Sequence, residues 1–185
     1  MQFPKVLFRL LTLALFLAPL GAMAQIGGLY ADFSTAALSS SGSPEYNGAT
    51  IGGYDEVNLK HSLPALNIGG DARMSFTHAN YGTGFAATSN WFDSFLIGPE
   101  VSFKTPVSLR PYAEILFGGA YASVSASAYG YSESVSKTYG ELAYIGGVDW
   151  KLAPHLAWRI LEINYGTFNS MSATTFSTGV VLRMP

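Results

Sequence analysis

The chain has 185 residues, of which only 12% are charged and 49% are hydrophobic, and its formal net charge is −2. The length suits a single domain, and the charge provides no basic surface for nucleic acid, so a nucleic-acid partner is not expected. The absence of cysteine excludes disulfides, thiol nucleophiles and cysteine-bound metals. With so few charges and so many aromatic residues, the chain fits a membrane protein or a large β-core.

Residues 1–24 have the features of a cleaved signal peptide. Two basic residues precede the apolar run Leu10–Leu20, which is shorter than the roughly 20 residues that a transmembrane helix needs. A small-x-small cleavage motif follows and ends at Ala24. We therefore expect export and a mature chain of residues 25–185, with an uncleaved anchor as the alternative.

The rest of the chain alternates between apolar and polar residues with period two, which indicates half-buried β-strands. No apolar run long enough for a helical span follows the signal peptide. The predicted strands, in chain order, are Gly28–Leu38, Ala49–Leu59, Leu66–His78, Trp91–Lys104, Leu109–Ala122, Tyr139–Lys151, Leu156–Phe168 and Thr174–Met184.

The connections between these strands follow a second pattern. Those after the second, fourth and sixth strands are short, and each contains one proline. The connections after the first, third and fifth strands are long and rich in Ser, Gly, Ala and Tyr: Ser39–Gly48, Ala79–Asn90 and Ser123–Thr138. This alternation is typical of an up-and-down barrel with turns at one end and loops at the other.

The two faces of the predicted strands favour a membrane barrel with a polar interior. Ile68 and Met74 share one face of the third strand, and Asp71 and Arg73 share the other. A charged side chain facing lipid would cost a few kcal/mol, so we expect the charges to point inward. The expected interior polar network consists of Asp71, Arg73, Glu100, Glu114, Asp149, Lys151, Glu162 and Arg183.

The seventh predicted strand does not follow this alternation throughout. Arg159 and Glu162 have opposite parity, so either a β-bulge separates them or Arg159 faces outward at the turn-side interface.

Aromatic residues near the strand ends are expected to form two interfacial girdles. These residues are Trp91, Phe92, Tyr121, Tyr139, Tyr165 and Phe168 at the loop end, and Phe103, Trp150 and Trp158 at the turn end.

Three segments resemble the small eight-stranded OmpA/OmpX-type outer-membrane barrel families: Ser94–Glu100, Arg110–Ala120 and Gly146–Arg159. The resemblance implies an all-β, eight-stranded antiparallel up-and-down transmembrane β-barrel. It also implies a location in the bacterial outer membrane, insertion by the barrel-assembly machinery, and contact with outer-membrane lipid and lipopolysaccharide. We expect a monomer. The chain departs from the family pattern at its end, where Met184-Pro185 replaces the usual terminal aromatic residue.

The sequence provides little support for catalysis. Some eight-stranded barrels modify lipid A, and His78 faintly resembles the histidine of the His-x-Ser-Asn motif of lipid A deacylases. Ala79 and Asn80 follow His78, however, so the motif's serine is missing. No histidine pair has metal-ligand spacing, and no acidic loop resembles a calcium site. We expect no enzyme activity, no cofactor and no metal.

The loops remain as candidates for function, because tyrosine among serine and glycine is also the composition of binding loops. The possible loop contacts are Tyr81, Phe85, Tyr129 and Tyr131. The sequence thus favours an outer-membrane barrel with a side-chain-filled polar interior and a structural or surface-interaction role. The alternatives are an adhesin or ligand-binding barrel, a lipid A-modifying enzyme, and a soluble lipocalin-like binding barrel.

Overall fold

The computed structural model describes residues 27–39, 45–58, 65–83, 86–128, 131–169 and 171–184. The strands are β1 (Gly27–Leu38), β2 (Tyr46–Asn58), β3 (Leu66–Thr83), β4 (Ala86–Phe103), β5 (Leu109–Ala128), β6 (Tyr131–Ala153), β7 (Leu156–Phe168) and β8 (Met171–Arg183). Among the described residues there is no helix long and apolar enough to cross a membrane.

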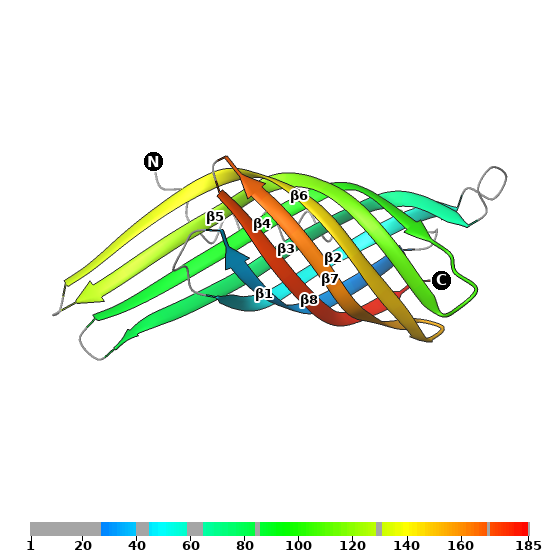
Figure 1. Ribbon diagram of the computed structural model, residues 1–185, viewed down its shortest axis with the longest axis horizontal. Coiled ribbons are helices and arrows are strands. Elements are labelled where there is room, and N and C mark those ends of the chain that lie inside the picture. Colours follow the sequence, from blue (N-terminus) through cyan, green and yellow to red (C-terminus); the bar gives the residue numbers. More distant parts are fainter. Residues whose placement is uncertain are drawn as a thin grey trace.

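The eight strands form a closed antiparallel barrel (Figure 1). Each strand pairs with the next along the chain, and β8 pairs back onto β1, from Gly28 opposite Arg183 to Leu38 opposite Ala173. Closure gives each strand in the wall two neighbours, so the wall has no open hydrogen-bonding edge. The predicted eight-stranded up-and-down architecture is confirmed.

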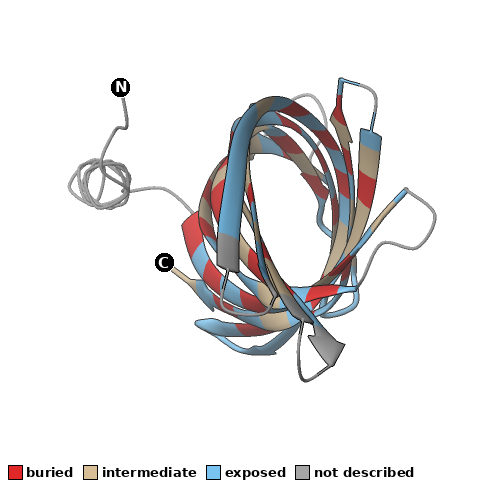
Figure 2. Cartoon of the chain, turned by 90° about the vertical axis from the view of Figure 1, so that its left-hand side faces the viewer, coloured by how far each residue is buried: buried red, intermediate tan, exposed pale blue. Residues whose placement is uncertain are grey.

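Side chains alternate between the interior of the barrel and its outer surface, which Figure 2 shows as bands along each strand. In β1, Asp32 and Ser34 are buried, whereas Leu29 and Phe33 are 41% and 58% exposed. Large apolar side chains are exposed all around the wall: Ile51, Ile68, Ile97, Ile115, Phe117, Leu142, Ile163, Phe176 and Leu182. This distribution is the reverse of that in a water-soluble barrel.

The aromatic residues agree with the expected girdles only in part. Trp91 and Tyr165 near the loop end are exposed, as are Phe103, Trp150 and Trp158 near the turn end. Three of the expected girdle residues lie inside instead: Phe168 is buried, the ring of Phe92 packs edge-on against it at 5.2 Å, and Tyr139 packs against the same cluster. Their parity explains the difference, because all three follow the inward-facing register of their strands.

Two connections that were expected to be long loops are mostly strand. β3 and β4 remain paired as far as Thr83 opposite Ala86, and β5 and β6 as far as Ala128 opposite Tyr131. β4 and β5 also pair along this extension, to Ala86 opposite Ala128. The result is a four-stranded sheet that continues the wall past the rim of the barrel (Figure 1).

We call this extension the wing and define it as residues 79–83, 86–90, 123–128 and 131–141. It begins where the neighbouring strands stop. The pairing of β2 with β3 ends at Asn47 opposite His78, and the pairing of β6 with β7 ends at Leu142 opposite Thr167. The residues of the wing are rich in Ser, Gly and Ala and carry few large apolar side chains, so they resemble a loop, and for this reason the sequence pattern missed the wing.

Candidate functional site

Arg73 of β3 occupies the middle of the barrel interior, and its side chain is 1% exposed. Its guanidinium donates to Asp71 at 2.9 Å, to Glu162 at 2.8 Å and to Glu114 at 2.5 Å. The Tyr30 hydroxyl donates to both oxygens of Asp71 at 2.9 Å. One cation thus holds three carboxylates that come from β3, β5 and β7.

Arg110 of β5 forms a second centre nearer the turn end. It pairs with Glu56 of β2, Glu100 of β4 and Asp149 of β6, the last at 2.9 Å. The guanidinium also lies 4.3 Å from the centroid of the Tyr54 ring, within the range of a cation–π contact. Strands on opposite sides of β5 are therefore linked through one side chain.

Arg159 of β7 forms the third centre and is also 1% exposed. It pairs with Asp32 at 3.0 Å, with Asp149 at 3.1 Å and with Glu162 at 2.9 Å. Its guanidinium lies 4.0 Å from the centroid of the Tyr30 ring. Because Asp149 is shared with the second centre and Glu162 with the first, the three arginines form one continuous network.

A β-bulge brings Arg159 into this network. The pairing of β7 with β8 shifts register between Arg159 and Glu162, and both residues are 1% exposed. The two residues between them, Ile160 and Leu161, are both exposed, at 36% and 45%. Two consecutive outward side chains are the signature of an inserted residue. The bulge is therefore the correct one of the two possibilities that the sequence left open.

Three tyrosine rings beside the charge network, those of Tyr30, Tyr54 and Tyr112, each lie over a glycine of a neighbouring strand. A Cβ atom at Gly28 would come within 2.6 Å of the Tyr54 ring, and Cβ atoms at Gly52 and Gly147 would collide with the rings of Tyr30 and Tyr112. Only glycine leaves room for a flat ring at these positions. The rings in turn support the guanidiniums, so the glycines contribute to the shape of the charge network.

Seven carboxylates surround the three guanidiniums. The acids are Asp32, Glu56, Asp71, Glu100, Glu114, Asp149 and Glu162. The carboxylates outnumber the guanidiniums, so the stability of the folded barrel depends more on each arginine than on each acid. An unpaired charge inside a barrel is costly, and removing one guanidinium would deprive three carboxylates of a partner.

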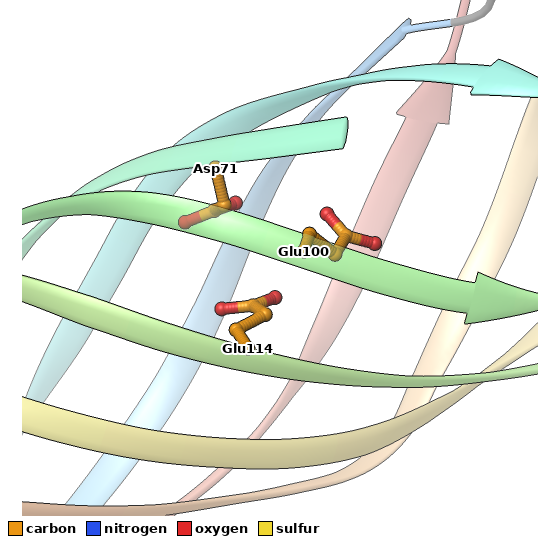
Figure 3. A group of neighbouring side chains, drawn as sticks. All are labelled: Asp71, Glu100 and Glu114. Atoms are coloured by element: carbon orange, nitrogen blue, oxygen red, sulfur yellow. The ribbon is translucent and has the colours of Figure 1, made fainter. Parts of the chain in front are cut away.

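Three of these acids form the one group among the described residues that could hold a metal ion. Oxygen atoms of Asp71, Glu100 and Glu114 lie within 4.8 Å of one another, and Figure 3 shows the three side chains on successive strands inside the barrel. Arg73 already pairs with Asp71 and Glu114, and Arg110 pairs with Glu100. The guanidiniums thus supply the positive charge that a metal would bring.

Six of the eight residues expected in the interior network lie in it: Asp71, Arg73, Glu100, Glu114, Asp149 and Glu162. The other two do not. Lys151 has inward parity, but it is exposed at the turn end, and Arg183 is half-buried at the same end. Neither forms an ion pair with any described residue.

Sequence reasoning missed three network residues and one further buried acid, and it left Arg159 open. The missed network residues are Asp32, Glu56 and Arg110; the further acid is Glu141, which is 6% exposed at the loop end. A signal for Arg110 was present, because it shares inward parity with Glu114 on the same strand. Asp32 likewise shares the parity of Ser34 in β1. Arg159 could not be placed without knowledge of the bulge.

The loop end of the interior contains two apolar clusters and, among the described residues, no ion pair. Ala120, Phe168 and Ala173 pack with Leu38, Phe92 and Tyr139 at this end. Ala36, Tyr46 and Ala79 form a second cluster that shares Leu38 and Phe92. An apolar layer therefore lies above the charged layer, and side chains fill the interior at both levels.

His78 lies near the rim on the outer face of β3. Its Nε2 is 3.1 Å from the Ser89 hydroxyl, and its ring centroid is 4.3 Å from that of Trp91. A histidine that activates a hydroxyl is normally oriented by a third group, and neither Ser89 nor Trp91 is a carboxylate.

Of the four possible loop contacts, only Tyr81 can be placed with its side chain. It is 47% exposed on the wing, and its hydroxyl accepts a hydrogen bond from Asn90 at 3.1 Å. Tyr131 is the first residue of β6, but its side chain lies outside the described part of the structure, as do Phe85 and Tyr129. The expected loop site therefore becomes a site on a sheet.

Comparison with known proteins identifies the fold. No protein-family model matches the sequence, and no curated protein sequence matches it. Among solved structures, the chain is similar to Ail, the attachment invasion locus protein of Yersinia pestis. The identity is 19% over 88% of this chain and 100% of Ail, with a TM-score of 0.65. It is also similar to Neisserial surface protein A, at 19% identity over 85% of this chain and 97% of that protein, with a TM-score of 0.57. The chain has the fold of the small eight-stranded outer-membrane β-barrels.

Proposed function

We propose that this protein resides in the bacterial outer membrane and acts there as a surface-interaction protein through its wing. In this proposal, residues 1–24 are the signal peptide and lie outside the described residues, and residues 25–185 are the mature barrel. The barrel contacts outer-membrane lipid and lipopolysaccharide and is inserted by the barrel-assembly machinery. The observation that carries the proposal is the combination of an apolar outer wall with a wing that continues it.

The outer wall supports the membrane location. Phe33, Phe117 and Leu182 are each more than half exposed on the wall, and in water such a surface would aggregate. The buried charges on the inner face would be out of place in a soluble lipocalin-like barrel, whose interior binds apolar ligands. A lipid environment accommodates both observations, because it covers the apolar wall and leaves the interior polar.

The filled interior supports a role other than transport. The side chains of Arg73, Arg110 and Arg159 cross the lumen and are tied to acids from seven strands, β1 to β7. Eight strands leave an interior only wide enough for side chains. We propose neither a pore nor a catalytic activity, because side chains fill the lumen and the serine of the deacylase motif is missing after His78.

The wing supports a role at the surface. In barrels of this type the longer connections are extracellular and the short turns are periplasmic, which supports a position of the wing outside the cell. One of the solved Ail structures is a complex with the heparin analogue sucrose octasulfate, at 18% identity and a TM-score of 0.65 to this chain. The wing carries both Glu133 and Lys137, so it is not a cationic surface, and we do not extend polyanion binding to this protein.

Fractionation and surface labelling test the proposal together. Because the chain has no cysteine, Ser136→Cys on the wing and Ser108→Cys on a turn each create one label site, and both positions are exposed. We expect the protein in the outer-membrane fraction, with faster gel migration unheated than boiled. A membrane-impermeant maleimide on intact cells should label Ser136→Cys but not Ser108→Cys. Labelling of Ser108→Cys alone, or recovery of a soluble protein, would refute the proposal.

A further inference from the structure

β6 has an open hydrogen-bonding edge in the wing. Residues 131–141 pair with β5 on one side, but the pairing of β6 with β7 starts only at Leu142. No described strand lies against the other side of this segment. An open edge presents a row of unpaired N–H and C=O groups that can pair with another chain.

The pairing with β5 determines which residues supply these groups. The backbone N–H of Lys151 donates to the carbonyl of Ser108 at 2.7 Å, so Lys151 directs its backbone groups toward β5. The register between β5 and β6 has no shift from there to the end of the wing. Backbone groups alternate in direction along a strand, so even-numbered residues such as Ser134 and Ser136 direct theirs to the open edge.

The sequence of this edge is complementary to itself when two copies run antiparallel. If Val135 faces Val135 of a second copy, Glu133 faces Lys137 on both sides of it, and Ser134 faces Ser136. The even-numbered residues then form the hydrogen-bonded pairs. The charged residues and Val135 fall in the non-hydrogen-bonded pairs, where side chains are closest.

Neighbouring registers lose this complementarity. A shift that centres the pairing on Glu133 places Glu133 opposite itself, and a shift that centres it on Lys137 places Lys137 opposite itself. Val135 is 72% exposed, the highest value among the exposed large hydrophobic side chains that the structure describes. Covering it against a second Val135 removes an apolar side chain from water.

We propose that the open edge of β6 binds the same edge of a second copy of this protein, antiparallel and centred on Val135, and that the two copies are anchored in facing membranes. The pairing rests on the proposed surface location of the wing. It replaces the monomer that the sequence led us to expect with a homotypic contact between cells.

The facing arrangement follows from symmetry. Two identical strands that pair antiparallel are related by a two-fold axis perpendicular to their sheet. The wing continues the barrel wall past the rim (Figure 1). In the proposed orientation this direction leads away from the membrane, so the axis lies roughly in the membrane plane. Rotation about it turns the second barrel to point the opposite way. Two barrels in one membrane would need an axis along the membrane normal, which cannot produce the antiparallel pair.

Disulfide trapping tests the register directly. Val135→Cys places one cysteine opposite its copy at a non-hydrogen-bonded pair, where the Cα separation of about 4.5 Å suits a disulfide. Val124 provides a matched control, because it is 44% exposed and lies opposite Val135 on β5, one strand from the edge. We expect mild oxidation of the folded protein in detergent to give covalent dimers of Val135→Cys, with at least tenfold less from Val124→Cys. Equal yields, or no dimer from folded Val135→Cys, would overturn the pairing.

Charge reversal tests the contact between cells. We would express the protein in two differently coloured strains of a host with truncated lipopolysaccharide and measure the settling of cell clusters. Glu133→Lys alone and Lys137→Glu alone each place like charges opposite each other, so each strain should lose clustering. A mixture of the two strains should regain clustering, as should one strain that carries both substitutions.

Wild-type cells that never cluster while the wing is labelled from outside would overturn the facing arrangement but leave the proposed function intact. A wing that no label reaches would mean instead that the proposed function itself is wrong.

Discussion

Replacement of Arg73 by methionine should destabilise the barrel severely. The change removes three ion pairs to Asp71, Glu114 and Glu162, each of which has a side chain at most 1% exposed. Asp71 would keep its Tyr30 hydrogen bonds, and Glu162 would keep Arg159. Glu114 would lose its one ion pair. Breaking a buried pair by removing one partner typically costs about 3–5 kcal/mol, and we expect a loss in the free energy of unfolding of that size.

The assay is a urea titration of the protein refolded into lipid vesicles, followed by the fluorescence of its 3 tryptophans and by heat-modifiable gel migration. Arg183→Met is the matched control, because Arg183 is half-buried and forms no ion pair with any described residue. Its free energy of unfolding should remain within about 0.5 kcal/mol of the wild type. If Arg73→Met unfolded at the same urea concentration and with the same slope as Arg183→Met, the interior network would not stabilise the fold as argued.

Three further outcomes follow from the same contacts. Glu114→Ala should lower the free energy of unfolding by about 3 kcal/mol, whereas Glu133→Ala on the exposed wing should change it by less than about 0.5 kcal/mol; equal urea midpoints would contradict the interior assignment. Gly147→Ala should cost about 1–3 kcal/mol in the same titration because its Cβ meets an interior tyrosine ring, while the outward-facing Gly146→Ala should be tolerated. Mass spectrometry of lipid A from expressing cells should show no lost acyl chain; loss of a chain that is restored by His78→Ala would show that the protein is a deacylase.

The sequence was informative where the membrane constrains it. Within the bilayer a strand must present apolar side chains to lipid at every second position, so the parity of Asp71, Arg73 and Glu114 could be determined from their neighbours. The same rule failed at β7, because the inserted residue between Arg159 and Glu162 changes parity without leaving a mark in composition. Charge alone could not show that Arg159 joins the interior.

Outside the bilayer the period-two rule has no physical basis, and here the sequence interpretation differed most from the structure. Residues 131–138 have no apolar face, and residues 123–128 alternate serine only with alanine and valine, so both segments were interpreted as loop, yet they continue β5 and β6. Serine, valine and tyrosine are compatible with strands, but such a composition does not distinguish a loop from a solvated sheet. The open edge of β6 depends on where β7 stops, which is a property of the assembled barrel.

The central claim is that this chain spans a membrane with apolar side chains facing lipid and charged ones facing inward. A single-cysteine scan of residues 113–117 on β5, in vesicles and with a spin label at each position, measures it directly. Collision with oxygen dissolved in the lipid should be high at Ile115 and Phe117, which are 51% and 59% exposed, and low at Glu114 and Leu116, which are 3% and 0% exposed. The same accessibility at all positions, or the opposite alternation, would contradict the account.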